Sequence, residues 1–273
     1  MSKRILITGA TDGIGKAFAK YMASKGHHVI IHGRNREKVK DTALEIIKKT
    51  KNKKIDTIVA DFASLTEVQS MSKSLLGKYN FLDILINNAA VIAPEYIESV
   101  DKIELTFQVN YLSPFLLTLN VLPLLKSKQR SQIINIASIA HAETINFNTI
   151  LDPEFFDSYS AYEISKLCNI LFTYKLAKKL QNKKITVNCL HPGVISTKLL
   201  HVLWSGGAPV KNAVEVIKNV MIQAEKKFET GKFFAGKSLV LSSAISYDEN
   251  TQQKIWDFSM NLLKLKGIIP GNF

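Results

Sequence analysis

Tyr162 and Lys166 stand four residues apart in the segment "YSAYEISKLCN", residues 159–169. Residues at this spacing share one face of a helix, so the sequence predicts a phenol beside an ammonium. Most pairs of this kind on soluble helices are solvated and have no function. A free tyrosine has a pKa of about 10, and an ammonium about 4 Å away, at an effective dielectric near 20, stabilises the phenolate by on the order of 4 kcal/mol. Before the desolvation of the ammonium itself is counted, this matches the roughly 4 kcal/mol that acid–base chemistry near pH 7 requires, so no metal is needed.

The segment "TGATDGIG" follows the first apolar run and opens a helical pattern. Gly9 allows a tight turn, Gly13 lets the backbone approach a pyrophosphate, and Gly15 permits close packing of the helix on the strand. The helix N-terminus offers N–H donors to phosphate groups. The order of strand, glycine loop and helix therefore predicts a dinucleotide site.

The second predicted strand ends in "IIHGRNRE", with Arg34 where an acidic residue would bind a ribose 2′-hydroxyl. A carboxylate would repel a 2′-phosphate, whereas an arginine can form a charge-assisted, bidentate contact with it. The sequence therefore favours NADP(H) over NAD(H). The alternative is that Arg34 is a solvated residue at the start of a helix.

Short β-branched runs alternate with helical periodicity along the chain, which is typical of a parallel sheet covered by helices. No linker or low-complexity tract divides the 273 residues. We expect one α/β domain over residues 1–273, a Rossmann fold with a doubly wound parallel sheet of about seven strands and helices on both faces. A long helix is expected over residues 101–126, and the last strand in "KSLVLSS", residues 237–243.

The net charge of +13 raises the question of nucleic-acid binding. The densest basic run, Lys48 to Lys54, has no interleaved aromatic residues, so a solvated loop and no nucleic-acid partner are expected. No stretch approaches 18 apolar residues, which predicts no membrane span. Cys168 and Cys189 lie in apolar segments and are expected to be reduced core residues of a cytoplasmic protein. The histidines form no ligand motif, so no metal is expected.

The glycine spacing GxxxGxG from Gly9, together with the YxxxK pair, resembles the short-chain dehydrogenase/reductase family. The segments "HGRNREK", "DFASL", "ELTFQVNYLSPFLLT", "AYEISKLCN" and "HPGVIST" look like its retinol-dehydrogenase-like branch. This resemblance implies an NADP(H)-dependent oxidoreductase. It would transfer a hydride between nicotinamide and a lipophilic carbonyl or alcohol, such as an aldehyde, a ketone, a retinoid or a steroid.

The resemblance also implies four catalytic residues. Tyr162 would be the general acid/base, and Lys166 would lower its pKa and hold the ribose. Ser138, at the end of "INIAS", would orient the carbonyl oxygen. Asn110 would hold a water molecule that relays protons to Lys166.

Further family positions imply contacts with the cofactor. Asp61 and Phe62 would cradle the adenine, and Pro192 and Gly193 would shape a turn against the nicotinamide. Ala90 stands where the family more often has glycine. The complete set of expected cofactor contacts is Gly9, Thr11, Asp12, Gly13, Ile14, Gly15, Arg34, Asn35, Asp61, Phe62, Asn88, Ala89, Ala90, Tyr162, Lys166, Pro192, Gly193, Val194 and Thr197.

The segment from about 198 to 230, which contains "HVLWSGGAP", is expected to be a substrate lid, with a plain loop as the alternative. Residues 94–105 and 140–158 are expected to form the substrate wall, with Phe147, Phe155 and Phe156 either in an apolar pocket or in the core. An NADP(H)-binding redox-sensing regulator without turnover is the alternative function. Its expected mark, loss of the catalytic tyrosine, lysine or serine, is absent. Homodimers and homotetramers are common in the family, and the sequence leaves the oligomeric state open.

Overall fold

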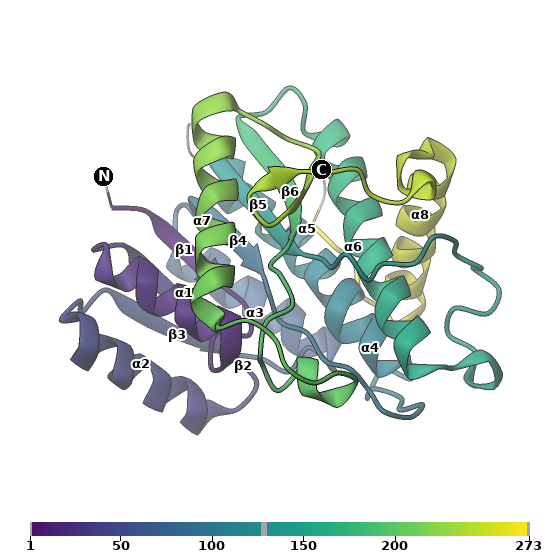
Figure 1. Cartoon of the computed structure of the whole chain (residues 1–273), viewed down its shortest axis with the longest axis horizontal. Helices are drawn as coiled ribbons and strands as arrows, with labels where there is room; N and C mark the ends of the chain where they lie inside the picture. The colour runs from purple at the N-terminus through teal and green to yellow at the C-terminus, as the bar shows by residue number, and fades with distance from the viewer. Residues whose placement is uncertain (1, 127–129, 272–273) are drawn as a thin grey trace.

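The predicted sheet is present and runs through the centre of the molecule (Figure 1). The computed structural model describes residues 2–126 and 130–271, and within them the strand order is β3-β2-β1-β4-β5-β6-β7-β8. Neighbouring strands are parallel except for the pair of β7 and β8. The strands are β1 (Arg4–Ile7), β2 (His28–Gly33), β3 (Ile55–Val59), β4 (Ile84–Asn87), β5 (Ser131–Ile136), β6 (Ile185–His191), β7 (Lys232–Ala235) and β8 (Ser238–Leu239).

Helices cover both faces of this sheet, which confirms the predicted fold class. One face is covered by α1 (Gly13–Ser24), α2 (Arg36–Thr50) and α7 (Val210–Lys227), and the other by α3 (Leu65–Lys78), α5 (Ser113–Lys126) and α6 (Ser158–Lys179). Strands β4, β5 and β6 are buried along their whole length because both of their faces pack against helices. The strand order switches direction at β1: β2 and β3 lie on one side of it, and β4 and the later strands lie on the other. The carboxyl ends of β1 and β4 therefore border a crevice.

The last parallel strand differs from the expectation. It is formed by Lys232–Ala235, between Gly231 and Gly236, whereas the predicted segment 237–243 contributes only the two residues of β8. Phe233 and Phe234 are both buried, each on a different face of the sheet. The apolar residues of "KSLVLSS" are more exposed, and Leu241 is 86% exposed. The last parallel strand therefore precedes the predicted segment, which contributes only the short antiparallel edge strand β8.

The helix expected over residues 101–126 is interrupted. A short α4 (Leu105–Phe107) leads into a π-helical turn, η1 (Gln108–Leu112), and α5 begins only at Ser113. The buried carboxylate of Glu104 caps α4 by accepting bonds from the N–H groups of Thr106 and Phe107. Turns of the π type inside helices often mark functional sites, and this one carries Asn110.

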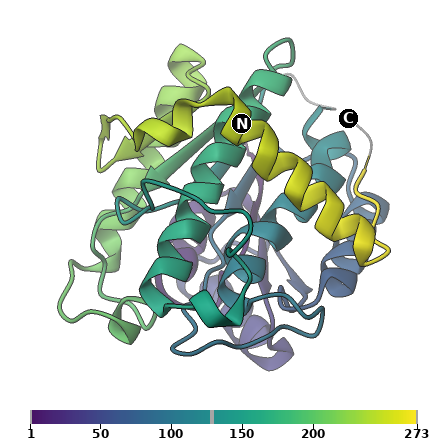
Figure 2. The same ribbon diagram turned by 90° about the vertical axis from the view of Figure 1, so that its right-hand side faces the viewer.

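The helix α6, which carries Tyr162 and Lys166, is held between the sheet and a further helix, α8 (Glu249–Leu265). Figure 2 shows α8 in yellow, lying across α6. Trp256 of α8 packs edge-on against Phe115, with 5.1 Å between the ring centroids. No helix in the described part of the chain combines the length and the apolar character needed to cross a bilayer.

Two smaller expectations are also confirmed. The basic run begins in the last turn of α2, and residues 51–54 form a loop before β3. Cys168 and Cys189 are buried and free.

Two glycines allow a matched test of packing around α1. A Cβ on Gly15 would lie 2.3 Å from the carbonyl oxygen of Gly9, whereas a Cβ on the helical Gly77 would meet nothing within 4 Å. We expect Gly15→Ala to lower the free energy of unfolding by about 1–3 kcal/mol. Gly77→Ala should raise it by about 0.5–1 kcal/mol. Urea unfolding measures both changes, and an unchanged midpoint for Gly15→Ala would contradict the close approach of α1 to β1.

Candidate active site

A cavity of about 680 Å³ opens at the carboxyl ends of the parallel strands. It runs from the start of α2, past the glycine loop, to Tyr162 on α6. Every site residue predicted from the sequence lines this cavity except Gly15 and Asn110. Predicted residues that line it are Gly9, Thr11, Asp12, Gly13, Ile14, Arg34, Asn35, Asp61, Phe62, Asn88, Ala89, Ala90, Ser138, Tyr162, Lys166, Pro192, Gly193, Val194 and Thr197.

The glycine loop packs against the residues that follow β4. Gly9 has a φ of +62°, and a Cβ there would lie 2.8 Å from the Cα of Ala89. Asn88 donates hydrogen bonds to the carbonyl oxygens of Thr8 and Gly9, at 2.8 and 3.1 Å. The Thr8 hydroxyl accepts bonds from the N–H groups of Asn88 and Ala89. The loop after β4 therefore shapes the glycine turn as well as bordering the cavity.

His32 is a site residue that the sequence analysis missed. Its Nδ1 accepts a bond from the Gly9 N–H at 3.2 Å, and its Nε2 lies 3.0 Å from the carbonyl oxygen of Ala60. The ring stacks on Phe62 with 4.5 Å between centroids. Burial lowers the pKa of His32 to about 4, so the neutral imidazole joins the ends of β1, β2 and β3. Its place inside an apolar strand was the available signal, because a buried imidazole requires partners.

Two cationic side chains line the end of the cavity next to α2. Arg34 and Lys38 both line it, whereas Arg36, between them in the sequence, does not. Asn35 caps α2 by accepting a bond from the Lys38 N–H at 2.9 Å, which fixes the start of this helix. Lys38, in the first turn of α2, is a second residue that the sequence analysis missed, and the fold brings it to the same end of the cavity as Arg34.

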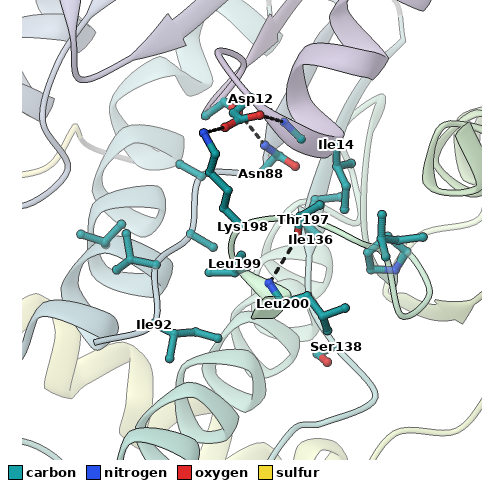
Figure 3. Close-up of a pocket in the computed structure, with 18 of the residues that line it drawn as sticks. Asp12, Ile14, Asn88, Ile92, Ile136, Ser138, Thr197, Lys198, Leu199 and Leu200 are labelled. Carbon is teal, nitrogen blue, oxygen red and sulfur yellow. Dashed lines mark hydrogen bonds and ion pairs between the residues drawn. The ribbon is translucent and has the colours of Figure 1, made fainter. Parts of the chain in front are cut away.

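Another cation reaches the glycine loop from the segment after β6. Figure 3 shows Lys198 extending to Asp12 at the start of α1, where the Nζ and Oδ2 atoms are 2.8 Å apart. Asp12 also caps α1 by accepting a bond from the Gly13 N–H at 2.8 Å. The ion pair lowers the pKa of the Asp12 carboxyl. The glycine loop and the segment that follows Thr197 are therefore connected across the cavity.

The candidate catalytic residues Ser138, Tyr162 and Lys166 lie together at the end of the cavity next to α6. Lys166 is 3% exposed, and its Nζ donates a bond to the carbonyl oxygen of Ile136 at 3.0 Å. The same Nζ lies 5.3 Å from the centroid of the Tyr162 ring. Ser138, two residues after Ile136, lines the cavity beside Tyr162, and its hydroxyl acts to lower the pKa of the phenol. The structure thus brings a phenol, a hydroxyl and an ammonium together at one end of the cavity.

The electrostatics differ from the expectation that Lys166 lowers the pKa of Tyr162. Burial raises the pKa of Tyr162, and the nearby Ser138 hydroxyl opposes this shift only in part. Burial also lowers the pKa of Lys166 to about 8. The lysine is bonded to a backbone carbonyl and lies against the tyrosine ring, so its charge is not directed at the phenol oxygen. Tyr162 is therefore protonated at pH 7 in this structure and can act as an acid.

Asn110 is placed behind the cavity wall. Its Oδ1 accepts a bond from the Val91 N–H at 2.8 Å, and its Nδ2 donates to the Val91 carbonyl and to the Ser165 hydroxyl at 2.9 and 3.1 Å. The backbone carbonyl of Asn110 accepts a bond from Asn169 of α6. These bonds fix Val91, which lines the cavity, and tie the π-helical turn to α6. The proton relay through Asn110 stays a prediction.

The predicted lid is shorter than expected. Residues 210–227 form α7, whose apolar side is buried on the sheet, so only residues 198–209, including η3 (Leu200–Val202), border the cavity as a loop. Trp204 of this loop lines the cavity and meets the Tyr162 ring edge-on, with 5.9 Å between centroids. Its ring also meets Tyr159 at 5.6 Å.

The three phenylalanines considered for the substrate pocket do not line the cavity. Phe147 packs against Phe258, Phe156 packs against Tyr96, and Phe155 is 64% exposed. The apolar part of the wall comes instead from residues that follow β4 and β5, from the first turn of α6 and from the loop after β6. These residues are Val91, Ile92, Ile139, Tyr159, Leu199, Leu200 and Trp204.

The buried charge of Lys166 should reduce stability. Its pKa is about 8 in the folded protein and has an ordinary value of 10.5 when the chain is unfolded, so burying the ammonium is unfavourable at pH 7. We expect Lys166→Met to raise the free energy of unfolding at pH 7 by on the order of 1–3 kcal/mol. Between pH 8 and 10.5 the unfolded chain binds the additional proton, so the parent protein gains stability with rising pH and the difference shrinks.

Urea unfolding at pH 7 and at pH 9.5 measures this dependence, with Lys40→Met on the exposed side of α2 as the matched control. Lys40→Met should not raise the free energy of unfolding at pH 7, and its difference from the parent should not change between pH 7 and pH 9.5. A Lys166→Met variant that is less stable than the parent at both pH values would contradict the cost assigned to the buried ammonium.

Comparison with known proteins agrees with this geometry. The family model described as short chain dehydrogenase matches residues 3–206. Short-chain dehydrogenase TIC 32 A, chloroplastic, of Brassica napus is 35% identical over 95% of this chain and 88% of that protein. Retinol dehydrogenase 13 of Mus musculus is 33% identical over 96% of this chain and 84% of its own length. Retinol dehydrogenase 11 of Homo sapiens is 31% identical over 96% of this chain and 86% of its own length.

Solved structures share the fold. An uncharacterised protein from Mycobacterium paratuberculosis has a TM-score of 0.79 and 25% identity, covering 96% of this chain and 93% of that one. An NADPH-bound carbonyl reductase from chicken fatty liver has a TM-score of 0.69 and 22% identity, covering 88% of this chain and 99% of that one. Together with a tyrosine, a lysine and a serine at one end of a cavity that begins at a glycine loop, these matches show that the chain belongs to the short-chain dehydrogenase family, on its retinol-dehydrogenase-like branch.

Proposed function

We propose that this oxidoreductase uses NADP(H) to transfer a hydride between nicotinamide and a lipophilic carbonyl or alcohol compound. The observation that carries the proposal is the single cavity that joins two cations at one end to Tyr162, Ser138 and Lys166 at the other. The names of the retinol dehydrogenases and of the NADPH-bound carbonyl reductase among the similar proteins support it.

The residues that line the cavity fit a dinucleotide phosphate. Arg34 and Lys38 supply positive charge at the end of β2, where a 2′-phosphate would lie. Gly9 and Gly13 have positive φ angles and no side chains, so the backbone N–H groups at the start of α1 are accessible where a pyrophosphate would bind. Tyr162 and Lys166 would hold the ribose next to the nicotinamide. When bound, the reduced nicotinamide supplies the hydride.

The chain's own residues would handle the proton. The Ser138 hydroxyl would donate a hydrogen bond to the substrate carbonyl oxygen and hold it beside the phenol. Tyr162 would give its proton to this oxygen as the hydride arrives on the carbon. Burial keeps the pKa of Tyr162 raised, so the phenol carries its proton at pH 7, which supports carbonyl reduction as the working direction.

The proposed substrate class rests on the wall around the phenol. Ile92, Ile139, Leu199 and Leu200 line this part of the cavity, and Trp204 borders Tyr162. Apolar side chains of this kind favour a lipophilic compound, and a few polar groups orient it.

Replacing the phenol oxygen tests the catalytic assignment. We expect Tyr162→Phe to lower kcat by about 100-fold or more, because the general acid is lost, and to weaken NADPH binding much less, because Lys166 and the phosphate contacts remain. Loss of NADPH absorbance with aldehydes, quinones, steroids and retinal measures turnover.

Tyr159→Phe is the matched control, since Tyr159 lines the same cavity and keeps its ring contact with Trp204. Tyr162→Phe at parental kcat would refute the role of Tyr162. Tight NADPH binding without turnover of any compound would support the redox-sensing regulator instead.

Replacing Arg34 tests the preference for NADP(H) over NAD(H). Arg34→Ala should weaken NADPH binding by about 10- to 100-fold, because a charge-assisted hydrogen bond contributes about 1.5–3 kcal/mol. NADH binding should be unchanged, since NADH has no 2′-phosphate. Arg36→Ala is the matched control, because Arg36 does not line the cavity. Nicotinamide fluorescence titrations give the dissociation constants, and a parent protein that binds NADH more tightly than NADPH would overturn the proposal for NADP(H).

A further inference from the structure

The turn that follows β5 holds Ser138 by two of its oxygen atoms. The Ser138 hydroxyl oxygen accepts a bond from the Ala140 N–H at 3.0 Å. The Ser138 carbonyl oxygen lies 2.8 Å from Nδ1 of His141. The bond from Ala140 occupies one lone pair of the hydroxyl oxygen and leaves the O–H as a donor toward Tyr162 or a substrate oxygen. The direction of that hydrogen depends on how the turn is held.

The imidazole of His141 has its second partner far along the chain. The Ser243 N–H donates to Nε2 of His141 at 3.0 Å, over a separation of 102 residues. Phe233 of β7 meets the imidazole edge-on, with 5.5 Å between the ring centroids. His141 therefore connects the turn that carries Ser138 to the segment between β8 and η4 (Ala244–Tyr247).

These two bonds define the protonation state of the imidazole. A backbone carbonyl can only accept a hydrogen bond, so Nδ1 must carry the proton that faces Ser138. A backbone N–H can only donate, so Nε2 must be unprotonated toward Ser243. The neutral form with its proton on Nδ1 is the one state of the ring that satisfies both neighbours.

The segment around Ser243 is itself fixed on α6. The Ser242 hydroxyl lies 2.8 Å from the hydroxyl of Tyr174, a residue of α6. Ser246 donates a bond to the Ser243 carbonyl, and Gln252 of α8 donates to the Ser246 carbonyl at 2.9 Å. The support for His141 is thus anchored to the same helix that carries the catalytic tyrosine.

We infer that His141 is a positioning residue that holds Ser138 at the reacting carbonyl by clamping the turn after β5 to the Ser243 N–H. The inference rests on the proposed function for the role of Ser138, whereas the clamp itself does not depend on it. His141 does not line the cavity and acts through the backbone carbonyl of Ser138.

Ser243 permits a matched pair of variants. Ser243→Pro deletes the N–H that bonds to His141. The φ of Ser243 is −55°, which is compatible with proline, so the backbone needs little change. Its buried hydroxyl has no hydrogen-bond partner among the described residues, so Ser243→Ala keeps the N–H and breaks no such bond. The difference between the two variants isolates the bond to the imidazole.

We expect His141→Ala to lower kcat by about 10- to 100-fold, because misplacing an orienting group by a fraction of an ångström is costly. The NADPH dissociation constant should stay within about twofold of the parent value, since the glycine loop is not part of the clamp. His141→Asn should recover part of the loss, because its amide N–H can reach the Ser138 carbonyl. Ser243→Pro should have a lower kcat than Ser243→Ala, and adding it to His141→Ala should cause no further loss.

Histidine ¹⁵N spectra test the clamp without turnover. The parent protein should show an Nδ1-protonated histidine whose signals disappear in His141→Asn and whose Nε2 signal moves in Ser243→Pro but not in Ser243→Ala. Absence of that tautomer overturns the inference. A kcat of His141→Ala within about twofold of the parent also overturns it, as does an equal loss of kcat and NADPH affinity. If no carbonyl compound is turned over, the proposed function fails, and the spectra alone decide the clamp.

Discussion

A buried ammonium whose hydrogen bond goes to a backbone carbonyl is the constraint on which the site depends. Lys166 donates to the Ile136 carbonyl, and burial lowers its pKa to about 8. Because an ion in a low-dielectric interior is unfavourable unless it is hydrogen-bonded, α6 must lie where the lysine can reach the end of β5. The same contact brings Tyr162 next to Ser138, two residues beyond Ile136. Burial lowers the pKa of the neighbouring His191 to about 4, and the charge on Lys166 adds to this shift.

Close backbone packing at the strand ends creates the rest of the cavity. Gly9 lies against Ala89 at a distance that no side chain on Gly9 would allow, and Gly15 is similarly close to the Gly9 carbonyl. His32 then links the glycine loop to the end of β3. These contacts keep the start of α1 near the carboxyl ends of β1 and β4, where open α/β sheets bind their ligands. The ion pair of Asp12 and Lys198 adds a connection across the opening.

The C-terminal part of the chain, which lies beyond the segment matched by the family model, packs against the outer side of α6. Trp256 of α8 packs against Phe115 and Phe172, so α8 buries the side of α6 that faces away from the sheet. Tyr111 of the π-helical turn bonds to Ser259 of α8. The π-helical turn, α6 and α8 therefore pack as one unit, with Asn110 and Lys166 inside it.

The sequence by itself determined the features that depend on residue type and short spacing. These include the glycine loop, the pair Tyr162 and Lys166 on one helix face, and the alternation that predicts a parallel sheet. Local spacing is sufficient for them because the repeat of a helix or strand determines which neighbours share a face. Tertiary structure decided the rest: which cations line the cavity, that His32 joins three strand ends, and that Trp204 borders Tyr162. It also decided the raised pKa of Tyr162, because burial and the direction of a neighbouring charge arise only when segments far apart in the chain pack together.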